Sequence, residues 1–408
     1  MKVTVTYSFY LLCLLSLLSC QKHDPAPTYA VTYDGNGSDG GTVPVDTKTY
    51  SNGSHVTVLD NTGNLVKLGY AFSNWNTKAD GTGSTYTVGS TFNMSTTNVT
   101  LYANWTPPAT AWTTSSLPGA DVWFSVVFGG GRFVAISQSG VSAASTDGGK
   151  TWTAGRLPSG FWYPLTYGGN NFVAMTFEVP INSPIIAATS PNGISWTQTT
   201  PDPATNLDQN FTSIAYGNGL FVIVGQGSLC FVSSDGVTWQ TGNFSRQSSY
   251  GYDAYITFGN NIFVAVTNNY VGASEATSAS TYASTSSDGI NWTIQTTLPS
   301  VSWQAITFGN NVFCAIDSGG KYTVTSADGI NWTTQTLPAT IGYLGALTFG
   351  NGAFVTIGYE STTVGTSTDG ATWKLYQTLP GAFQWNSITY GNGSFVAIEP
   401  NGHVAISN

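Results

Sequence analysis

The sequence of 408 residues predicts an all-β protein: a seven-bladed β-propeller preceded by a small β-rich module. Three observations support this prediction. A phrase of the form S-x-D-G-x-x-W recurs with its tryptophans 40 to 53 residues apart. A second phrase, typified by "FGNNIFVAV", occurs seven times, and the two ends of the repeat region carry complementary parts of one unit. One four-stranded unit of this length cannot bury both faces alone, so such units pack side by side in a ring.

The first twenty residues, "MKVTVTYSFYLLCLLSLLSC", have the anatomy of a secretion signal, with an early lysine and an apolar run that is short for a membrane span. An ordinary cleaved signal is one interpretation. The ending "LLSC" resembles a bacterial lipobox, and this resemblance implies that Cys20 becomes the lipidated first residue of the mature protein. We therefore expect a lipoprotein signal peptide at 1–20, a tether at 21–28, and an anchor in the outer membrane of the cell envelope, on its periplasmic or its outer side.

Residues 29–105 alternate short apolar and polar runs with turns such as "DGNGSDGG" and "ADGTG", which predicts strands without a helix. The phrases "VTYDGNG", "GYAFSNW" and "LYANW" resemble the Listeria-Bacteroides repeat, of the internalin B-repeat type. The resemblance implies a compact, β-grasp-like surface module used as a spacer or adhesive unit. It also implies four core aromatic residues: Phe72, Trp75, Tyr102 and Trp105. The stretch "TPPAT" at 106–110 is expected to be a stiff linker before the propeller at 111–408.

Each repeat of the propeller is expected to hold four strands, A to D, from the channel outward. The "GNG" or "GNN" between two apolar runs predicts an A–B hairpin, because Asn and Gly suit positive φ. A–B turns and S-x-D-G turns should then share one face, and the D–A and B–C loops the other. The last repeat ends at "HVAISN" without a tryptophan, whereas 109–119 supplies an orphan Trp112 and its following strand. We expect these ends to complete one blade, which argues against an open solenoid.

The S-x-D-G-x-x-W phrase resembles the Asp-box of sialidase-type (BNR) propellers, with Asn192 in the aspartate's place in one copy. Its expected role is structural: the carboxylate accepts backbone N–H groups, the glycine supplies an unusual dihedral angle, and the tryptophan covers the turn. A calcium site is the alternative, but each turn offers one carboxylate where Ca²⁺ needs several oxygens. The aspartates concerned are Asp147, Asp235, Asp288, Asp328 and Asp369. No metal or other cofactor is expected.

An aromatic residue lies five or six positions before each "FG" or "YG", where strand A begins on the loop face. Around a channel mouth these rings could stack on sugars or on an extended peptide. The alternative is that they are wedges packed between blades. The residues are Trp123, Trp162, Phe211, Tyr252, Trp303, Tyr343 and Trp385. The long B–C segments "TFEVPINSPI" and "TNNYVGASEATSASTYAS" favour recognition on this face.

The sequence also bears on whether the propeller is catalytic. Sialidase chemistry needs several arginines around a carboxylate, and the propeller's three arginines occupy different strand and loop positions: Arg132, Arg156 and Arg246. A glycoside hydrolase using Asp317 and Glu399, at equivalent positions after strand B, is the alternative function. These carboxylates belong to blades that are not adjacent, and His403 has no serine or cysteine context. We expect no enzymatic activity.

The net charge is −9, with 11 basic and 20 acidic residues and no basic cluster, so nucleic acid is not an expected partner. Cys230 and Cys314 lie in apolar strands of different repeats and are expected to be buried without a disulfide. The resulting prediction is a monomeric, lipid-anchored protein of the cell envelope. Its propeller is expected to bind a glycan or a surface protein.

Overall fold

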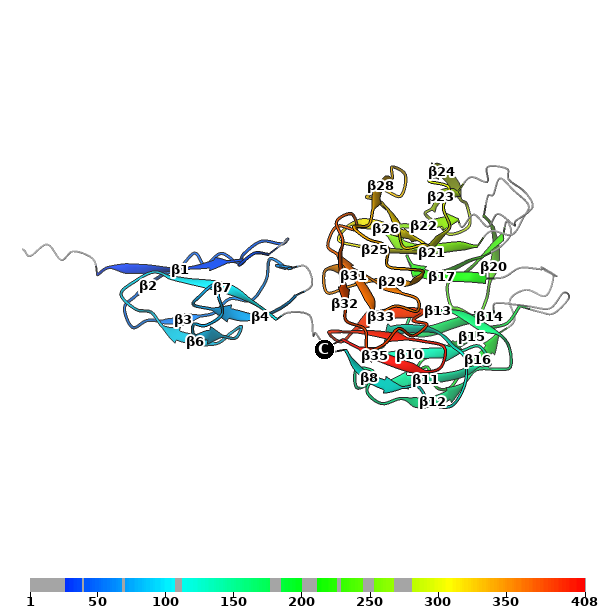
Figure 1. Cartoon of the computed structure of the whole chain (residues 1–408), viewed down its shortest axis with the longest axis horizontal. Coiled ribbons are helices and arrows are strands. Elements are labelled where there is room, and N and C mark those ends of the chain that lie inside the picture. Colours follow the sequence, from blue (N-terminus) through cyan, green and yellow to red (C-terminus); the bar gives the residue numbers. More distant parts are fainter. Residues whose placement is uncertain are drawn as a thin grey trace, which may run out of the picture.

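The computed structural model describes residues 26–38, 40–67, 70–106, 112–176, 185–199, 211–225, 229–244, 253–267 and 281–407. The predicted signal peptide with Cys20, the tether up to residue 25 and the predicted linker from residue 107 lie outside the described residues. Every regular element in these ranges is a β-strand (Figure 1), and no apolar helix of membrane-spanning length occurs in the part of the chain that is described.

The N-terminal module is built on a five-stranded sheet in the order β2-β1-β7-β4-β5, with β3 and β6 forming a separate pair. Its strands are β1 (Thr28–Asp34), β2 (Thr49–Ser51), β3 (His55–Thr57), β4 (Ala71–Asn76), β5 (Thr85–Tyr86), β6 (Thr91–Asn93) and β7 (Val99–Thr106). β1 and β7 are parallel. The fully buried Trp75 centres the core, with edge-on contacts to Tyr33 and Phe72 at centroid distances of 4.7 and 5.0 Å.

The predicted core aromatics of this module need one correction. Trp105 packs against the core together with Phe72, but Tyr102 is not part of it. Successive side chains of a strand point to opposite faces, and the buried Leu101 and Ala103 of β7 occupy the core face. Tyr102 between them therefore points to the other side of the sheet.

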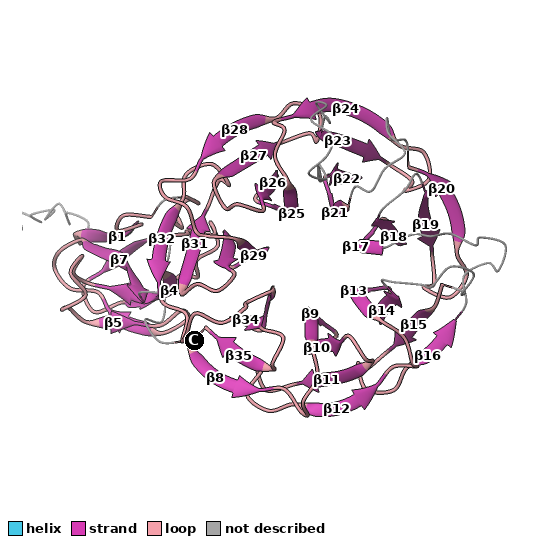
Figure 2. Cartoon of the chain, turned by 45° about the vertical axis from the view of Figure 1, so that its right-hand side comes forward, coloured by secondary structure: helices cyan, strands magenta, loops and turns pink. Residues whose placement is uncertain are grey.

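The remaining described residues form seven four-stranded sheets, or blades, arranged around a central channel (Figure 2). Blade 1 contains β9 (Trp123–Gly129), β10 (Arg132–Ser137), β11 (Val141–Ser145) and β12 (Thr153–Arg156). Blade 2 contains β13 (Trp162–Gly168), β14 (Asn171–Thr176), β15 (Ala187–Ser190) and β16 (Thr197–Thr199). Blade 3 contains β17 (Phe211–Gly217), β18 (Leu220–Gly225), β19 (Leu229–Ser233) and β20 (Gln240–Asn243). Blade 4 contains β21 (Ala254–Gly259), β22 (Ile262–Thr267), β23 (Thr281–Ser286) and β24 (Thr293–Leu298). Blade 5 contains β25 (Trp303–Gly309), β26 (Val312–Asp317), β27 (Tyr322–Ser326) and β28 (Thr333–Thr336). Blade 6 contains β29 (Leu344–Gly350), β30 (Ala353–Gly358), β31 (Thr363–Ser367) and β32 (Lys374–Gln377). Blade 7 contains β33 (Ser387–Gly391), β34 (Ser394–Ile398), β35 (His403–Ile406) and, from the start of the repeat region, β8 (Thr113–Ser116).

The predicted split blade is confirmed. β8 pairs with β35 in antiparallel register, with Thr114 opposite Ala405, so the start of the repeat region supplies the outer strand of blade 7. Blade 7 also packs against blade 1 through the hydrophobic cluster that contains Trp123 and Val396. The ring is therefore closed, and an open solenoid is excluded for this chain.

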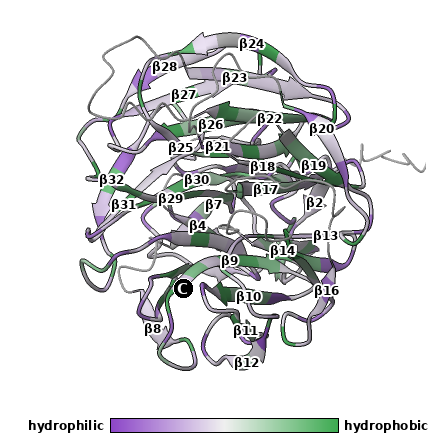
Figure 3. Ribbon diagram, turned by 90° about the vertical axis from the view of Figure 1, so that its right-hand side faces the viewer, coloured by the Kyte–Doolittle hydropathy of each residue, from purple (hydrophilic) through white to green (hydrophobic). Residues whose placement is uncertain are grey.

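The repeated A–B turns adopt the predicted backbone. In blade 4, Asn260 and Asn261 have φ of 47° and 62°, and the strands close on the pair Gly259 and Ile262. Positive φ at both central residues is typical of a type I′ turn, whose twist matches that of the flanking strands. Apolar residues concentrate in the inner strands, whereas the outer strands are more hydrophilic (Figure 3).

Each S-x-D-G turn is stabilised by hydrogen bonds between residues of the same turn. In blade 4, Asp288 Oδ1 accepts hydrogen bonds from the backbone N–H groups of Ile290 and Asn291 at 2.9 and 2.8 Å. The indole of Trp292 donates to the carbonyl of Gly289 at 2.8 Å, and Gly289 has φ of 71°. Burial opposes ionisation of Asp288, but these hydrogen bonds outweigh it and lower its pKa from 3.8 to about 2. The carboxylate is thus engaged within its own turn, as the structural interpretation requires.

Blade 2 shows that an amide can replace the carboxylate in this turn. Asn192 Oδ1 accepts from the N–H groups of Ile194 and Ser195, both at 2.9 Å. Elsewhere in the propeller, Cys230 and Cys314 are buried and unpaired, as predicted. The chain therefore relies on packing rather than on a disulfide between these two residues.

The module contacts the propeller on the face that carries the A–B turns and S-x-D-G turns, which we call the turn face. Val66 lies so close to Gly352 in the A–B turn of blade 6 that a side chain there would overlap it. A cavity of about 170 Å³ between the two parts is lined by Lys67 and Tyr70 of the module and by Trp112 among the propeller residues. The opposite face, with the D–A and B–C connections, is called the loop face.

Candidate ligand-binding site at the channel mouth

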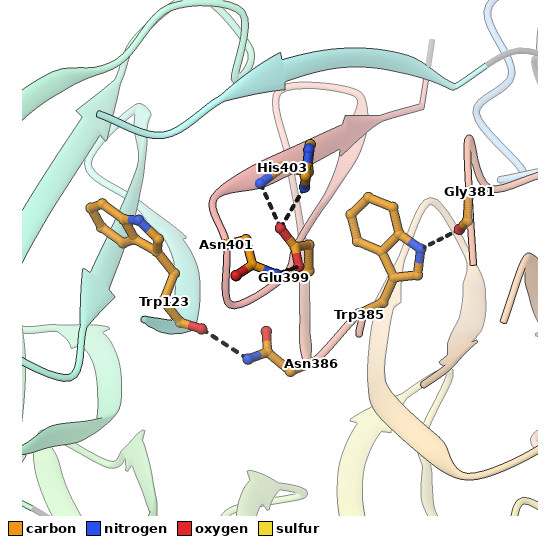
Figure 4. Close-up of polar contacts among 7 residues, drawn as sticks. All are labelled: Trp123, Gly381, Trp385, Asn386, Glu399, Asn401 and His403. Atoms are coloured by element: carbon orange, nitrogen blue, oxygen red, sulfur yellow. Dashed lines mark hydrogen bonds and ion pairs between the residues drawn. The ribbon is translucent and has the colours of Figure 1, made fainter. Parts of the chain in front are cut away.

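The predicted aromatic platform is wrong for five of its seven residues, because their side chains have no exposed surface: Trp123, Trp162, Phe211, Trp303 and Trp385. Each packs onto the preceding blade. Trp303, for example, lies in a cluster with Val266 and Leu298 of blade 4. The indoles of Trp162, Trp303 and Trp385 also donate to backbone carbonyls, as Figure 4 shows for Trp385 and Gly381. These residues are the inter-blade wedges of the alternative interpretation.

The other two predicted platform residues are Tyr343 and Tyr252, and Tyr343 does not occupy the position that the prediction gave it. Tyr343 is 75% exposed, and its neighbour Leu344 occupies the wedge position, buried and paired with Gly358. Tyr252 lies outside the described residues. In its blade the buried Ala254 begins the inner strand opposite Thr267.

The two candidate catalytic carboxylates each support their own B–C loop. Asp317 Oδ1 accepts from the N–H groups of Lys321 and Tyr322 at 2.7 and 2.6 Å. Glu399, fully buried, accepts from the N–H of His403 at 3.0 Å, lies 2.6 Å from its Nδ1, and accepts from Asn401 Nδ2 at 3.0 Å (Figure 4). Blades 5 and 7, which carry them, are separated by blade 6. The structure does not bring them together as an acid–base pair.

The electrostatics of Glu399 agree with a structural role. Burial would raise its pKa, but the hydrogen bonds from His403 and Asn401 outweigh burial and lower the pKa below the usual value of 4.5. A general acid at neutral pH needs the opposite shift. The equivalent residue in blade 1, Ser137, also holds its loop, because its Oγ accepts from the N–H of Val141 at 2.9 Å.

The arginines do not form a carboxylate-binding group among the described residues. Arg132 begins β10 on the turn face, and its Nη1 donates to the carbonyl of Asn192 at 3.5 Å. Arg156 ends the outer strand β12, and Arg246 lies outside the described residues. The described residues also contain no group of three His, Cys, Asp or Glu side chains placed to hold a metal ion.

The residue after each wedge lines the channel instead. In blade 5, Trp303 pairs with Asp317 and Ala305 with Ile316, so Gln304 has no partner in the register. This β-bulge recurs at the same place in β9, β13, β17 and β29. A bulge re-aims a side chain and is frequent next to functional sites.

All seven blades contribute to a channel cavity of about 200 Å³. One residue of each blade, directly after the wedge position, forms a ring around it: Phe124, Tyr163, Thr212, Tyr255, Gln304, Gly345 and Asn386. Hydrogen bonds between neighbouring inner strands support this ring. Asn386 Nδ2 donates to the carbonyl of Trp123 at 2.9 Å (Figure 4), and Thr212 Oγ1 donates to that of Ala254 at 2.7 Å. The ring is aromatic on the side of blades 1, 2 and 4 and polar or small elsewhere.

Two further cavities lie on the aromatic side of the channel. One of about 230 Å³ is lined by Phe124, Gln138, Phe161, Trp162, Tyr163, Thr212, Asp253 and Tyr255. The other, of about 300 Å³, is lined by Asp121, Gln138, Ser139, Gly160 and Phe161. The cavity of about 230 Å³ shares lining residues with each of the other two, so the three cavities lie next to one another. We call them together the mouth groove.

Exposed aromatic surface and negative charge characterise the mouth groove. Phe161 is 50% exposed, and the rings of Phe124 and Tyr163 meet edge to face at 5.6 Å and 64°. Burial and then the negative charge of Asp253 raise the pKa of Tyr163, and burial is also the main cause of the raised pKa of Tyr255. Both phenols are neutral at physiological pH. The described lining residues of the three cavities include no Lys, Arg or His.

The periodic aromatic position predicts core residues and not the residues of the groove, because side chains at that position pack between blades. A usable signal was present in "WF" at 123–124 and "FWY" at 161–163, where more aromatic residues occur than one wedge requires. The chain segments 177–184, 200–210, 245–252 and 268–280 lie outside the described residues.

Residues 29–104 match the Listeria-Bacteroides repeat domain family, which confirms that prediction. Two curated proteins of Evansella cellulosilytica align over 77 residues, or 19% of this chain: a putative Gly-rich membrane protein at 49% identity and a putative membrane protein at 42%. The aligned part spans only 9% and 11% of these relatives. The similarity therefore covers a small part of this chain and a small part of each relative.

Solved structures similar to the propeller confirm its fold. YCF48 bound to a D1 peptide aligns with a TM-score of 0.53 and 18% identity, over 72% of this chain and 96% of that one. Virginiamycin B lyase of Staphylococcus aureus aligns with a TM-score of 0.59 and 13% identity, over 73% and 99%. The WD40 propeller of Doa1 aligns with a TM-score of 0.53 and 14% identity, over 73% and 97%. At these identities the likeness establishes a β-propeller and no particular activity.

Proposed function

We propose that this protein is a non-enzymatic recognition protein of the cell envelope, whose propeller binds a protein or glycan ligand in the mouth groove. The observation that carries the proposal is the set of adjacent cavities in the mouth groove, with the half-exposed Phe161 and the partly buried rings of Phe124, Tyr163 and Tyr255. Aromatic side chains in such cavities supply large contact areas at low conformational cost. The peptide complex of YCF48 is an example of ligand binding by a propeller of similar fold.

The position of the module supports this arrangement. Val66 and its neighbours contact the turn face, whereas the mouth groove opens on the loop face. A lipid anchor at Cys20, on the N-terminal side of the module, would therefore leave the groove accessible. The names of the two curated relatives, both membrane proteins, agree with a membrane-associated role for the module.

A hydrolase has less support than a binding protein. Asp317 and Glu399 are engaged by the backbone of their own loops, and the lowered pKa of Glu399 does not suit a general acid. We therefore assign these residues to loop structure. The proposal places recognition on aromatic surface rather than on carboxylate chemistry.

Binding of the purified protein to glycan arrays and to arrays of envelope-protein peptides tests the proposal. We expect the wild type to bind a subset of one array and Phe161→Ala to weaken that binding about tenfold or more, as for a central aromatic contact. Ile330→Ala, which removes an exposed apolar side chain from an S-x-D-G turn on the turn face, is the matched control. Equal binding by Phe161→Ala and wild type, or turnover of an arrayed glycan, would contradict the proposal.

A further inference from the structure

We infer that the N-terminal module docks on the propeller at the position of a missing seventh S-x-D-G turn, so that the two parts move as one unit. The contact of Val66 with Gly352 lies in this interface. The interface is on the turn face, so the inference does not depend on the proposed function of the groove on the loop face.

Each of the six S-x-D-G turns covers the blade that precedes its own. A side chain at Gly289, in the turn of blade 4, would meet Val222 and Val232, which stand opposite each other on the two middle strands of blade 3. The glycines of the other five turns lie over the corresponding residues of their preceding blades: Gly149, Gly193, Gly236, Gly329 and Gly370. The six turns therefore cover blades 1 to 5 and blade 7.

Blade 6 has no such turn over it among the described residues. The corresponding pair in this blade is Val355 and Thr366, which stand opposite each other in the register. The turn that would cover them belongs to blade 7, where Ser407 takes the serine position and Trp112 the tryptophan position. Because blade 7 is assembled from the two ends of the repeat region, no continuous chain joins these two residues through an Asp-Gly pair.

The tryptophan of the missing turn has a different partner. In the six complete turns the indole donates to the glycine of its own turn, as Trp292 does to the carbonyl of Gly289 at 2.8 Å. Trp112 has no such glycine, and its Nε1 donates to Thr378 Oγ1 of blade 6 at 3.3 Å. The position of the missing turn therefore lies between Trp112 and the middle strands of blade 6.

Module residues lie at this position, beside blade 6 (Figure 2). Val66 and Lys67 of the module line the same cavity of about 170 Å³ as Val355 and Thr366. Val66 Cγ1 would also lie 2.6 Å from a Cβ atom at Gly352, in the A–B turn of blade 6. In blades 1, 3 and 7 a Cβ atom at the equivalent turn glycine would have no described heavy atom within 4 Å: Gly131, Gly219 and Gly393.

The module holds Val66 in place from its own side. Leu65 is buried in the module core, whereas the partly exposed Val66 faces the propeller. The backbone of Val66 exchanges two hydrogen bonds with Gly40, at 3.0 and 3.3 Å, and Lys67 Nζ donates to the carbonyl of Asn36 at 3.2 Å. Both sides of the contact thus belong to regular structure. Docking there keeps the module on the turn face and leaves the loop face uncovered by it.

A disulfide across the interface tests the docking. The Cβ atom of Val66 lies 3.6 Å from the position of a Cβ atom at Gly352, and disulfides span about 3.5–4.5 Å between these atoms. The full chain with Val66→Cys and Gly352→Cys should therefore crosslink under mild oxidation, as measured by mass spectrometry of a non-reduced digest. Val66→Cys with Gly393→Cys, in the equivalent turn of blade 7, is the matched control and should not crosslink. Cys230 and Cys314 are buried and do not compete for the new thiols.

A second variant shows whether the contact holds the module. Gly352→Asn places a side chain where Val66 lies. Asparagine occupies the equivalent turn position in three other blades with φ between 60° and 66°: Asn170, Asn261 and Asn311. The turn should therefore keep its backbone. Small-angle X-ray scattering of the full chain should give a larger radius of gyration for Gly352→Asn than for wild type, whereas Gly393→Asn should leave it unchanged.

No crosslink at Gly352, equal crosslinking at Gly352 and Gly393, or unchanged scattering of Gly352→Asn would overturn the inference. Melting curves verify folding of each variant, and Gly352→Asn decides alone if the double substitution prevents folding. None of these measurements involves a ligand of the groove. Failure of the proposed function would therefore leave the docking intact, and loss of the docking would leave the array experiment to be judged by itself.

Discussion

The glycine of each "FG" or "YG" pair lies under an aromatic ring of the next blade. A side chain at Gly259 would overlap the ring of Phe308, and one at Gly391 would overlap the ring of Phe128. The second contact joins blade 7 to blade 1. The repeated pair therefore makes two packing contacts. Its aromatic ring packs against the glycine of the preceding blade, and its own glycine packs against the ring of the following blade.

Wedge and surface aromatics should differ sharply in their contribution to stability. Trp303 is fully buried between blades 4 and 5, so Trp303→Ala should lower the free energy of unfolding by about 3–5 kcal/mol. Tyr343 is 75% exposed, so Tyr343→Ala should change it by less than about 0.5 kcal/mol. Denaturant unfolding followed by tryptophan fluorescence and circular dichroism measures both. Similar losses for the two variants would contradict the assignment of the wedge position.

At the scale of single elements, β8 is the strand on which closure of the ring depends. The N–H of Leu117 donates to the carbonyl of Gly402 at 2.8 Å, just beyond the end of β8. Hydrogen-bonded and non-bonded pairs alternate along an antiparallel ladder. The N–H of Ser115 therefore faces β35, whereas the N–H of Thr114 faces away from it.

Proline substitutions in β8 exploit this alternation. Ser115→Pro should lower the free energy of unfolding by about 1–3 kcal/mol, because it removes a ladder hydrogen bond at the closing seam. Thr114→Pro should cost less, and Ser115→Ala accounts for the loss of the side-chain hydrogen bond to Gly149. Thermal unfolding compares the three variants with wild type. A cost for Thr114→Pro that matches that of Ser115→Pro would show that the ladder bond is unimportant.

At the scale of the whole molecule, the turn face meets the module and the loop face carries the mouth groove. The two faces differ in their connections. Every A–B turn has two residues between the paired strand ends, and each S-x-D-G turn is held by its own Asp or Asn side chain, whereas the other connections vary in length. Attachment on one face and recognition on the other is the division of roles that we propose for the chain.

Membrane attachment through Cys20 is the whole-molecule prediction. In cells given labelled palmitate, the wild type should incorporate label and sediment with the membranes, whereas Cys20→Ala should remain unlabelled. Cys230→Ala is the matched control, since that cysteine is buried in blade 3. Label in the Cys20→Ala protein equal to that in wild type would disprove the anchor, and protease treatment of intact cells would show which side of the membrane the propeller faces.

The propeller and its split blade could be predicted because the chain repeats its local chemistry. The hydrogen bonds of each S-x-D-G turn join residues only a few positions apart, as those from Ile290 and Asn291 to Asp288 show. The local sequence is therefore enough to specify the geometry of the turn. The orphan Trp112 and the incomplete last repeat likewise indicated closure without any knowledge of side-chain contacts.

The sequence by itself thus determined the order of strands, the turns and the closure of the ring, all of which depend on local patterns and on counting repeats. Only the tertiary structure decided which residues face the channel. Wedge and groove residues are neighbours in the chain. A bulge such as the one between Trp303 and Ala305 turns the groove residue inward in five blades, whereas Tyr255 lines the channel from a regular pair with Val266. The groove also joins Asp121, Tyr163 and Asp253, which come together only because separate blades converge on one axis. No local pattern records that convergence.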